Sequence, residues 1–413
     1  MSKLDKLIQE LCPNGVEYVP LWSITTWDKK FNSVDKEKQK QVIKYNYYLA
    51  TDLKALESSN GTIKILTTNI TNLYAKEEDV VDMYSDGEIV CIPWGGNPIV
   101  QYYKGKFITG DNRIATSNNL NKLVNKFLYY FLLNNIQLIA SFYRGSGIKH
   151  PDMSKVLDLS IPLPPIEVQE EIVRILDNFT ELTAELTAEL TARKKQYEYY
   201  RDTLLTFDEN DKSVEWKTLG DISIDMYRGA GIKRDEVTET GIPCVRYGEI
   251  YTTYNIWFNQ CVSHTDPNVI TNKKYFEKGD ILFAITGENI EDIAKSCVYM
   301  GEDKCLAGGD IVVMKHNQNP KYLAYALSTT NARMQKGKGK VKSKVVHSSV
   351  PALKEIIIPI PPLDEQERIV SILDRFEALC NDISKGLPAE IEARKKQYEY
   401  YRDKLLTFKE KIA

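Results

Sequence analysis

The chain of 413 residues repeats itself with a period near 200 residues. Arg193–Asp202 reads RKKQYEYYRD, and the same letters return 201 positions later at Arg394–Asp403. Two further blocks are similar: Ile161–Phe179 to Ile358–Phe376 at an offset of 197, and Val16–Ile24 to Val214–Ile222 at an offset of 198. Because chance does not produce three matches at nearly one offset, the sequence predicts a tandem duplication of one structural unit.

The duplication is uneven along the chain. Residues 25–145 and 223–342 share only strand-like fragments, such as Asp86–Trp94 (DGEIVCIPW) beside Lys278–Thr286 (KGDILFAIT). His150 and His347 fall at the 197 offset, and we expect them to close each globular region onto its helix. Drift between the halves is one explanation. We favour another, in which the alike parts meet a common partner and the unlike parts meet different targets.

The alike blocks predict long helices. Apolar residues recur at spacings of three and four, the pattern of a coiled-coil seam, and we expect a break near Lys385 with Pro388 restarting the helix in its first turn. Val173 and Ile175 widen the stripe, either for burial against a globular region or for docking a partner's helices. The seam or partner-docking residues are Ile172, Leu176, Phe179, Leu186, Leu190, Tyr197, Tyr200 and Leu204, then Ile369, Leu373, Phe376, Ile383, Tyr398, Tyr401 and Leu405.

The stretch Thr180–Ala192 (TELTAELTAELTA) is a four-residue repeat of strong helix formers. The offset changes from 197 to 201 across it, so the first helical segment is one such unit shorter than the second. Each unit adds about 6 Å of helix. We therefore predict that this stretch sets the distance between the two globular regions.

Composition limits the class of protein. The sequence has no long apolar run and no signal-peptide pattern, so we expect a cytoplasmic protein without a membrane span. The seven scattered cysteines lack metal-ligand spacing and predict reduced thiols. The net charge is −3, yet residues 1–160 carry 19 Lys and Arg against 17 Asp and Glu, and residues 161–209 carry 5 against 11. Slightly basic globular regions are compatible with DNA binding but do not identify it.

Motifs of catalysis are missing from the sequence. Asn97-Pro98 lacks the second proline and the aromatic residue with which an adenine methyltransferase holds its target base, and no P-loop occurs. Glu302-Asp303-Lys304 is only a fragment of a nuclease-like motif. We expect no catalytic, cofactor-binding or metal-binding residue in this chain. A recognition module fused to its own enzyme is disfavoured, since two repeats already use the whole length.

The chain resembles the specificity subunits of type I restriction–modification systems. Three features carry this resemblance: the pattern PLPP…E.Q..I..ILD.F, the TAEL repeats and the block RKKQYEYYRD. The resemblance is closest over residues 161–207 and 358–408. It implies two target-recognition domains, each reading one half of a split double-stranded DNA sequence. It also implies helical regions that dock two copies of a DNA-adenine methyltransferase subunit, which restriction subunits then join. S-adenosylmethionine, ATP and Mg would belong to those partners. A coiled-coil scaffold or DNA-binding regulator without such a partner is the competing interpretation.

The expected fold is α+β with pseudo-twofold symmetry. We expect target-recognition domains at residues 1–160 and 210–357, each mixing helices and strands. Helical spacer regions at residues 161–209 and 358–413 would pair as an antiparallel coiled coil.

The candidates for contact with DNA are basic side chains of the unlike regions. Lys336–Lys344 places five lysines at alternate positions, on one side if extended, with glycines that let the backbone approach phosphate. Arg144–His150 is its counterpart. For any single residue, a solvated surface charge is the alternative. The full set is Lys29, Lys30, Arg113, Arg144 and Lys149 in the first half, and Arg228, Lys233, Arg234, Arg246, Lys336, Lys338, Lys340, Lys342 and Lys344 in the second.

Overall fold

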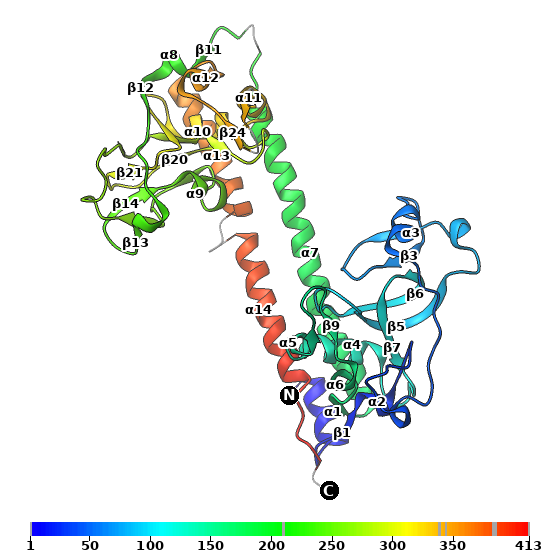
Figure 1. Cartoon of the computed structure of the whole chain (residues 1–413). Helices are drawn as coiled ribbons and strands as arrows, with labels where there is room; N and C mark the ends of the chain where they lie inside the picture. The colour runs from blue at the N-terminus through cyan, green and yellow to red at the C-terminus, as the bar shows by residue number, and fades with distance from the viewer. Residues whose placement is uncertain (1, 209–210, 338–339, 343–344, 382–385, 412–413) are drawn as a thin grey trace. The chain divides into compact units, whose positions relative to one another are not determined.

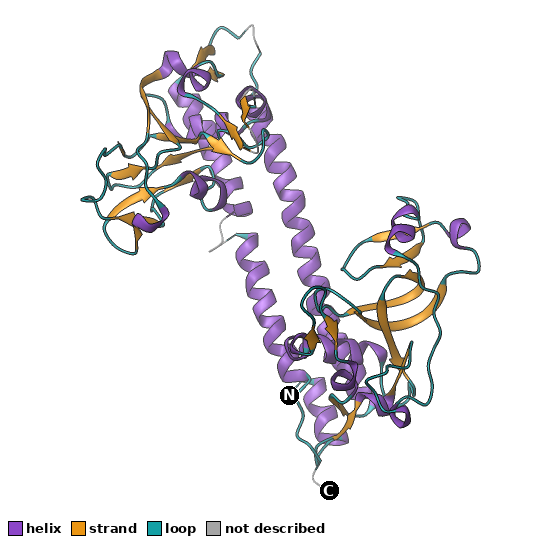
Figure 2. Cartoon of the chain, viewed as in Figure 1, coloured by secondary structure: helices purple, strands orange, loops and turns teal. Residues whose placement is uncertain are grey.

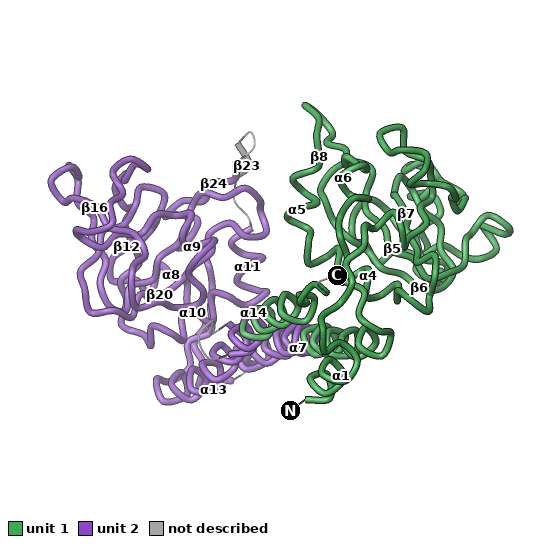
Figure 3. The backbone as a smooth tube through the Cα atoms, turned by 90° about the horizontal axis from the view of Figure 1, so that it is seen from below, with its two compact units in different colours: residues 1–185, 393–413 green, residues 186–392 purple. Residues whose placement is uncertain are grey.

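The computed structural model describes residues 2–208, 211–337, 340–342, 345–381 and 386–411 (Figure 1). The chain forms two compact units, coloured separately in Figure 3. Unit 1 comprises residues 1–185 and 393–413, and unit 2 comprises residues 186–392. Each unit therefore combines one of the unlike globular regions with parts of both helical segments.

Unit 1 is built on a six-stranded sheet in the order β2-β7-β5-β6-β3-β4 (Figure 2). Only β3 and β6 pair in parallel. Helix α4 (Asn125–Asn134) packs on β5, β6 and β7 and buries Phe127 and Leu128 completely. The strands are β2 (Thr25–Trp27), β3 (Ile63–Leu66), β4 (Leu73–Ala75), β5 (Ser85–Pro93), β6 (Gln101–Thr109) and β7 (Asn112–Ser117).

Unit 2 contains two five-stranded sheets, in the orders β12-β22-β18-β20-β15 and β13-β16-β14-β21-β17. Helix α10 (Pro320–Ser328) packs on β18 and β20; it begins with the Asn319 side chain as cap and Pro320 in its first turn. The strands are β12 (Ser223–Arg228), β13 (Val237–Thr238), β14 (Ile242–Val245), β15 (Trp257–Phe258), β16 (Ser263–Thr265), β17 (Tyr275–Phe276), β18 (Ile281–Ala284), β20 (Ser296–Tyr299), β21 (Cys305–Ala307) and β22 (Ile311–His316).

Short helices and hairpin strands complete both units. In unit 1 they are α1 (Lys3–Leu11), α2 (Leu21–Ile24), η1 (Lys36–Lys38), α3 (Ala50–Ala55), η2 (Glu77–Val80), α5 (Ile136–Ser141), β8 (Tyr143–Arg144), β9 (His150–Pro151) and α6 (Met153–Leu157). In unit 2 they are α8 (Leu219–Ile222), η3 (Arg234–Glu236), α9 (Tyr247–Thr252), β19 (Thr286–Gly287), α11 (Thr330–Lys336), β23 (Lys340–Lys342), β24 (Val345–His347) and α12 (Val350–Lys354).

The matched sequence blocks meet each other inside each unit. In unit 1, β1 (Glu17–Pro20) pairs antiparallel with β10 (Ser160–Leu163), and in unit 2 β11 (Glu215–Thr218) pairs with β25 (Ile357–Ile360). Pro162 and Pro359 lie within these strands. A two-stranded sheet has only edge strands, which tolerate a residue without an N–H group. The matching blocks therefore form the same framework in both units, although the globular regions that they support differ.

Side-chain contacts repeat across this framework. In unit 1, Asp177 accepts hydrogen bonds from the Tyr130 hydroxyl at 2.6 Å and from Lys126 at 2.8 Å. In unit 2, Asp374 accepts the same two bonds from Tyr325 and Lys321, both at 2.7 Å. Gln169 and Gln366 likewise each donate to a proline carbonyl five residues earlier, at 2.8 Å. These bonds fix α4 and α10 to equivalent turns of the helical segments.

The helical segments form α7 (Ile166–Leu204), α13 (Leu363–Asn381) and α14 (Leu387–Leu405). Helix α7 runs without interruption through the TAEL repeats. The predicted restart is confirmed, since α14 begins at Leu387 with Pro388 in its first turn. Among the described residues, no helix is long and apolar enough to span a membrane.

The predicted seam residues contribute to both units. Ile172, Leu176 and Tyr197 are buried in α7, as are Ile369 and Leu373 in α13. Tyr200 is 39% exposed but stacks on Phe376. The predicted Ile383 lies outside the described residues. The remaining predicted positions are partly buried: Phe179, Leu186, Leu190, Leu204, Phe376, Tyr398, Tyr401 and Leu405.

The wider apolar stripe of α7 packs on unit 1 itself. Val173 and Ile175 are partly buried against the core that contains Phe127 and Leu128. Of the two explanations for these residues, the structure therefore favours burial against the globular region over docking of a partner.

Candidate nucleic-acid interface

Both units present a β-hairpin at the same point of the duplicated framework. In unit 1, β8 and β9 form the hairpin between α5 and α6; in unit 2, β23 and β24 form it between α11 and α12. The sequence pairs Arg144–His150 with Lys336–Lys344; of the described residues of that lysine run, Lys340 and Lys342 belong to the unit 2 hairpin, whereas Lys336 belongs to α11.

The unit 1 hairpin exposes basic side chains. Arg144 and Lys149 are both exposed, and Arg144 lies 3.8 Å from the Asp152 carboxylate. Gly145 has φ +142°, and a Cβ atom there would lie 2.7 Å from the Ile148 carbonyl oxygen. This turn therefore requires glycine, which brings the backbone close to whatever the hairpin contacts.

The matched histidines fasten the hairpins to the sheets. His150 Nδ1 lies 2.8 Å from the Trp94 carbonyl oxygen, and the two rings are 5.3 Å apart. His347 Nδ1 lies 3.2 Å from the Thr286 hydroxyl oxygen. Trp94 and Thr286 are the last residues of the two strand motifs that match in sequence. The prediction that these histidines close each region onto its helix was wrong, because their partners belong to the globular region.

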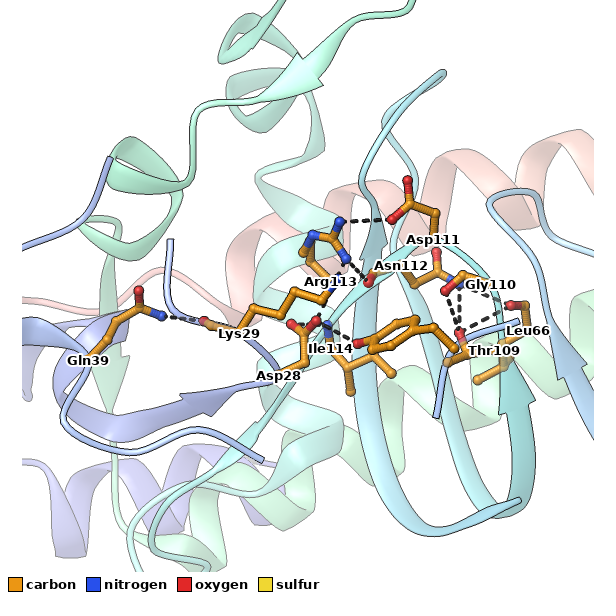
Figure 4. Close-up of polar contacts among 11 residues, drawn as sticks. Asp28, Lys29, Gln39, Leu66, Thr109, Gly110, Asp111, Asn112, Arg113 and Ile114 are labelled. Atoms are coloured by element: carbon orange, nitrogen blue, oxygen red, sulfur yellow. Dashed lines mark hydrogen bonds and ion pairs between the residues drawn. The ribbon is translucent and has the colours of Figure 1, made fainter. Parts of the chain in front are cut away.

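Arg113 is a structural residue and not a surface contact. Its guanidinium donates to Asp111 at 2.8 Å, lies 3.7 Å from the Asp28 carboxylate and covers the Trp94 ring at 4.4 Å. Figure 4 shows Arg113 with Asp28 and Asp111. Asp28 also accepts a bond from the Tyr47 hydroxyl at 2.5 Å, and burial raises its pKa. A buried carboxylate needs such partners, so the prediction of Arg113 as a DNA contact is corrected.

Lys336 is also buried, with 6% of its surface exposed. Its ammonium donates to Ser296 Oγ at 2.9 Å and to the Leu327 carbonyl at 2.8 Å. It ends α11 and is not part of an extended strand, so it does not share a face with the lysines that follow. Of these, Lys340 and Lys342 belong to β23, while Lys338 and Lys344 lie outside the described residues.

The other residues predicted to contact DNA differ in the partners that their side chains already have. Lys29 and Lys30 are exposed, and Lys29 lies over the Tyr47 ring at 4.5 Å. Lys233 and Arg234 are exposed beside η3. In contrast, Arg228 donates to Asp310 and to the Gly309 carbonyl, and Arg246 to Glu249 at 2.9 Å.

A basic and aromatic hollow of unit 2 was missed by the sequence reasoning. Lys274 lies 5.9 Å from the Tyr227 ring, and Lys304 lies 4.9 Å from the Tyr275 ring. With Lys273 they line a cavity of about 350 Å³. The run Lys273-Lys274-Tyr275 was the available signal in the sequence. Such side chains can contact phosphates and stack on bases.

The helical segments also carry matched exposed aromatic residues. Tyr199 and Tyr400 occupy the same position of the repeated RKKQYEYYRD block and are 67% and 62% exposed. Each meets its neighbouring tyrosine edge to face, Tyr200 at 5.6 Å and Tyr401 at 5.4 Å. Burial within this chain does not account for two exposed rings at matched positions.

A duplicated framework under two unlike globular regions with exposed basic side chains is compatible with a DNA-specificity protein. The chain belongs to the type I restriction–modification DNA specificity family, because the model of that family's domain matches residues 29–193 and 212–393. It is similar to the specificity subunit of the type I restriction enzymes EcoR124I and EcoR124II of Escherichia coli. The two are 30% identical, over 99% of this chain and 97% of that subunit.

Solved structures share the fold. The S subunit of a type I restriction–modification system from M. genitalium has a TM-score of 0.57 at 16% identity, over 95% of this chain and 96% of that one. A chain from a study of complex assembly and conformational transition of the type I R-M system has the same TM-score and identity, over 95% of this chain and 98% of that one.

Proposed function

We propose that the chain is a non-catalytic specificity subunit that reads a bipartite, asymmetric double-stranded DNA target. Its two globular regions read one half-site each. Its helical segments dock two copies of one DNA-adenine methyltransferase subunit, and restriction subunits join the complex through them. S-adenosylmethionine, ATP and Mg are bound by those partners in the cytoplasm, and this chain holds none of them.

One observation carries this proposal: an unchanged framework supports two different globular regions. The contacts of Asp177 and Asp374 agree to about 0.1 Å, whereas unit 1 holds one six-stranded sheet and unit 2 holds two five-stranded sheets. Two copies of the same recognition region would favour a symmetric DNA target. Two unlike recognition regions on one framework favour a DNA target whose two halves differ.

The docking of two identical partners rests on Tyr199 and Tyr400. Exposed tyrosines at matched positions of an identical block are suited to contact the same protein surface twice, since aromatic rings are enriched at the centres of interfaces. A DNA-binding regulator that binds no partner protein would not require exposed tyrosines at matched positions. Gene neighbourhood separates the two possibilities, because a specificity subunit is expected beside an adenine methyltransferase gene.

Native mass spectrometry of the reconstituted complex tests the docking. We expect two methyltransferase copies per chain, and one copy after Tyr199→Ala or after Tyr400→Ala. Tyr247→Ala, at an exposed tyrosine of α9 in unit 2 and outside α7, α13 and α14, is the control and retains both copies. The chain alone should transfer no methyl group to DNA. Methylation by the isolated chain, or unchanged stoichiometry in both variants, contradicts the proposal.

A further inference from the structure

Unit 2 contains a cavity of about 460 Å³ beside the second half of α7. Its walls come from α7, α11 and α13, from Tyr251 of α9 and from residues 291–296. The volume lies in the range of small-molecule sites in proteins. The unit 1 helix α5, which is the counterpart of α11, contains no basic residue. The basic lining that α11 contributes therefore has no counterpart in α5.

The wall formed by α11 and residues 291–296 carries three cations without an ion-pair partner among the described residues. Lys336 is buried and, in the same part of the chain, donates to Ser296 Oγ and to the Leu327 carbonyl, both neutral acceptors. Lys295 donates to the Tyr251 carbonyl at 3.1 Å. Among the described residues, no ion pair is formed by Lys295, by Lys336 or by Arg333, which is exposed. A buried ammonium without a counter-ion is costly, and an anion in the cavity would remove that cost.

The electrostatics of the wall agree with this geometry. Burial is the main cause that lowers the pKa of Lys295 and the pKa of Lys336, the latter to about 7. The nearby Arg333 guanidinium lowers both pKa values further, whereas the Asp292 carboxylate raises that of Lys295. Arg333 therefore lies close enough to repel both ammonium groups, and a bound anion would relieve that repulsion.

The acidic residues around the cavity offset the charge of this wall only in part: Asp292 raises the pKa of Lys295 but makes no ion pair with it in the part of the chain that the structure describes. Glu198, Glu291, Asp292 and Glu377 line the cavity, yet none of them makes an ion pair with the three cations in the described part of the chain. Asp292 accepts from the Asn289 amide at 3.1 Å, and Glu377 accepts from the Asn381 amide at 2.9 Å. The other lining arginine, Arg201, is already paired with Asp202 at 2.8 Å.

We propose that this cavity binds a phosphate group, held by Lys295, Arg333 and Lys336. Two ammonium groups and a planar guanidinium supply the charge-assisted donors that a phosphate dianion needs. The group can be carried by a free nucleotide or by the DNA backbone, and the chemistry of recognition is the same. This inference does not rest on the reading of two half-sites.

Calorimetric titration of the full chain with inorganic phosphate and with adenosine 5′-monophosphate tests the site. We expect saturable binding that weakens at least about tenfold in Lys336→Met and in Arg333→Gln, as expected for loss of one charge-assisted bond. Lys336→Met replaces the ammonium with an apolar side chain of similar length. Arg333→Gln alters an exposed residue, so we expect that variant to fold like the wild type. Lys354→Gln, at an exposed lysine of α12 outside the cavity, is the control and binds like the wild type.

Titration with duplex DNA distinguishes the two sources of the phosphate group. If the backbone supplies it, duplex DNA displaces the mononucleotide, and both variants bind duplex more weakly than Lys354→Gln does. If a free nucleotide supplies it, the mononucleotide still binds when the chain is saturated with duplex. The proposal is overturned if neither probe binds saturably and duplex affinity is unchanged in both variants. It is also overturned if both variants bind all probes as the wild type does.

Discussion

Phe179 stacks on Tyr401 with ring centroids 5.5 Å apart and planes inclined by 23°. The equivalent residues of the other half, Phe376 and Tyr200, stack at 5.4 Å and 26°. In each unit the phenylalanine comes from one helical segment and the tyrosine from the other. Each unit therefore needs both helical segments to complete its packing, and unit 1 joins two separate stretches of the chain.

Removal of either phenylalanine should destabilise the unit that contains it. Phe179→Ala and Phe376→Ala each lose a partly buried ring and a stacked pair, at a cost of about 2 kcal/mol. Urea unfolding followed by fluorescence measures this cost. Leu363→Ala, at a 60% exposed position of α13, should change the free energy of unfolding by less than about 0.5 kcal/mol. Equal effects at Leu363 and Phe376 would contradict the packing described here.

Arg113 and Lys149 should respond in opposite ways to replacement by glutamine. Arg113→Gln leaves Asp28 buried without its cation, and we expect a loss of about 3 kcal/mol of stability. Lys149→Gln should leave stability unchanged but weaken binding to duplex DNA of any sequence, with a salt dependence that falls by about one unit of slope. Urea unfolding and DNA titration at several salt concentrations test both. A stable Arg113→Gln variant with weakened DNA binding would restore Arg113 as a contact.

Glu171 should make folding sensitive to acid. Hydrogen bonds from Arg174 and Lys3 hold the pKa of this carboxyl at about 2, below the ordinary value of 4.5. Because the pKa is lower in the folded state, the stabilisation is present above pH 4.5 and is lost as the pH falls towards 2. Glu171→Gln should therefore be less stable than the wild type at pH 7 and should match it near pH 2. Thermal unfolding across this range measures the difference, and a constant difference would exclude the ion pairs as its cause.

The TAEL repeats should set the spacing of the DNA target. Insertion of one four-residue unit within Thr180–Ala192 adds about 6 Å to an uninterrupted helix, against about 3.4 Å per base pair. The methylated motif of the variant should keep both half-sites and gain one or two spacer base pairs. Sequencing of modified DNA from a host with the variant tests this. Altered half-site bases would show that the repeats do more than separate the readers.

The sequence could predict features whose signal lies in spacing. The helical segments, the restart at Pro388 and the correspondence of Arg144–His150 with the second hairpin all follow from periodicity or from the 197 offset. Asp177 and Asp374 share that offset too, and their role in the framework was available but not recognised. Helix spacing alone predicts Leu204 and Leu405 as the last seam residues. The buried leucines are instead Leu205 and Leu406, one position later and directly after α7 and α14.

The errors concern charges whose burial depends on distant parts of the chain. The Asp28 carboxylate that engages Arg113 lies 85 positions earlier in the sequence, and the Ser296 hydroxyl that engages Lys336 lies 40 positions earlier. Nothing local to either residue signals these partners. A basic residue in a divergent region therefore looks like a surface contact until the tertiary structure shows what covers it.

Methylome sequencing of a host that carries the partner genes, with and without the gene for this chain, tests the central claim most directly. Two unlike readers on one framework predict the loss of a single bipartite, asymmetric N6-methyladenine motif when this chain is removed. Loss of a palindromic or uninterrupted motif, or no loss at all, would contradict the account.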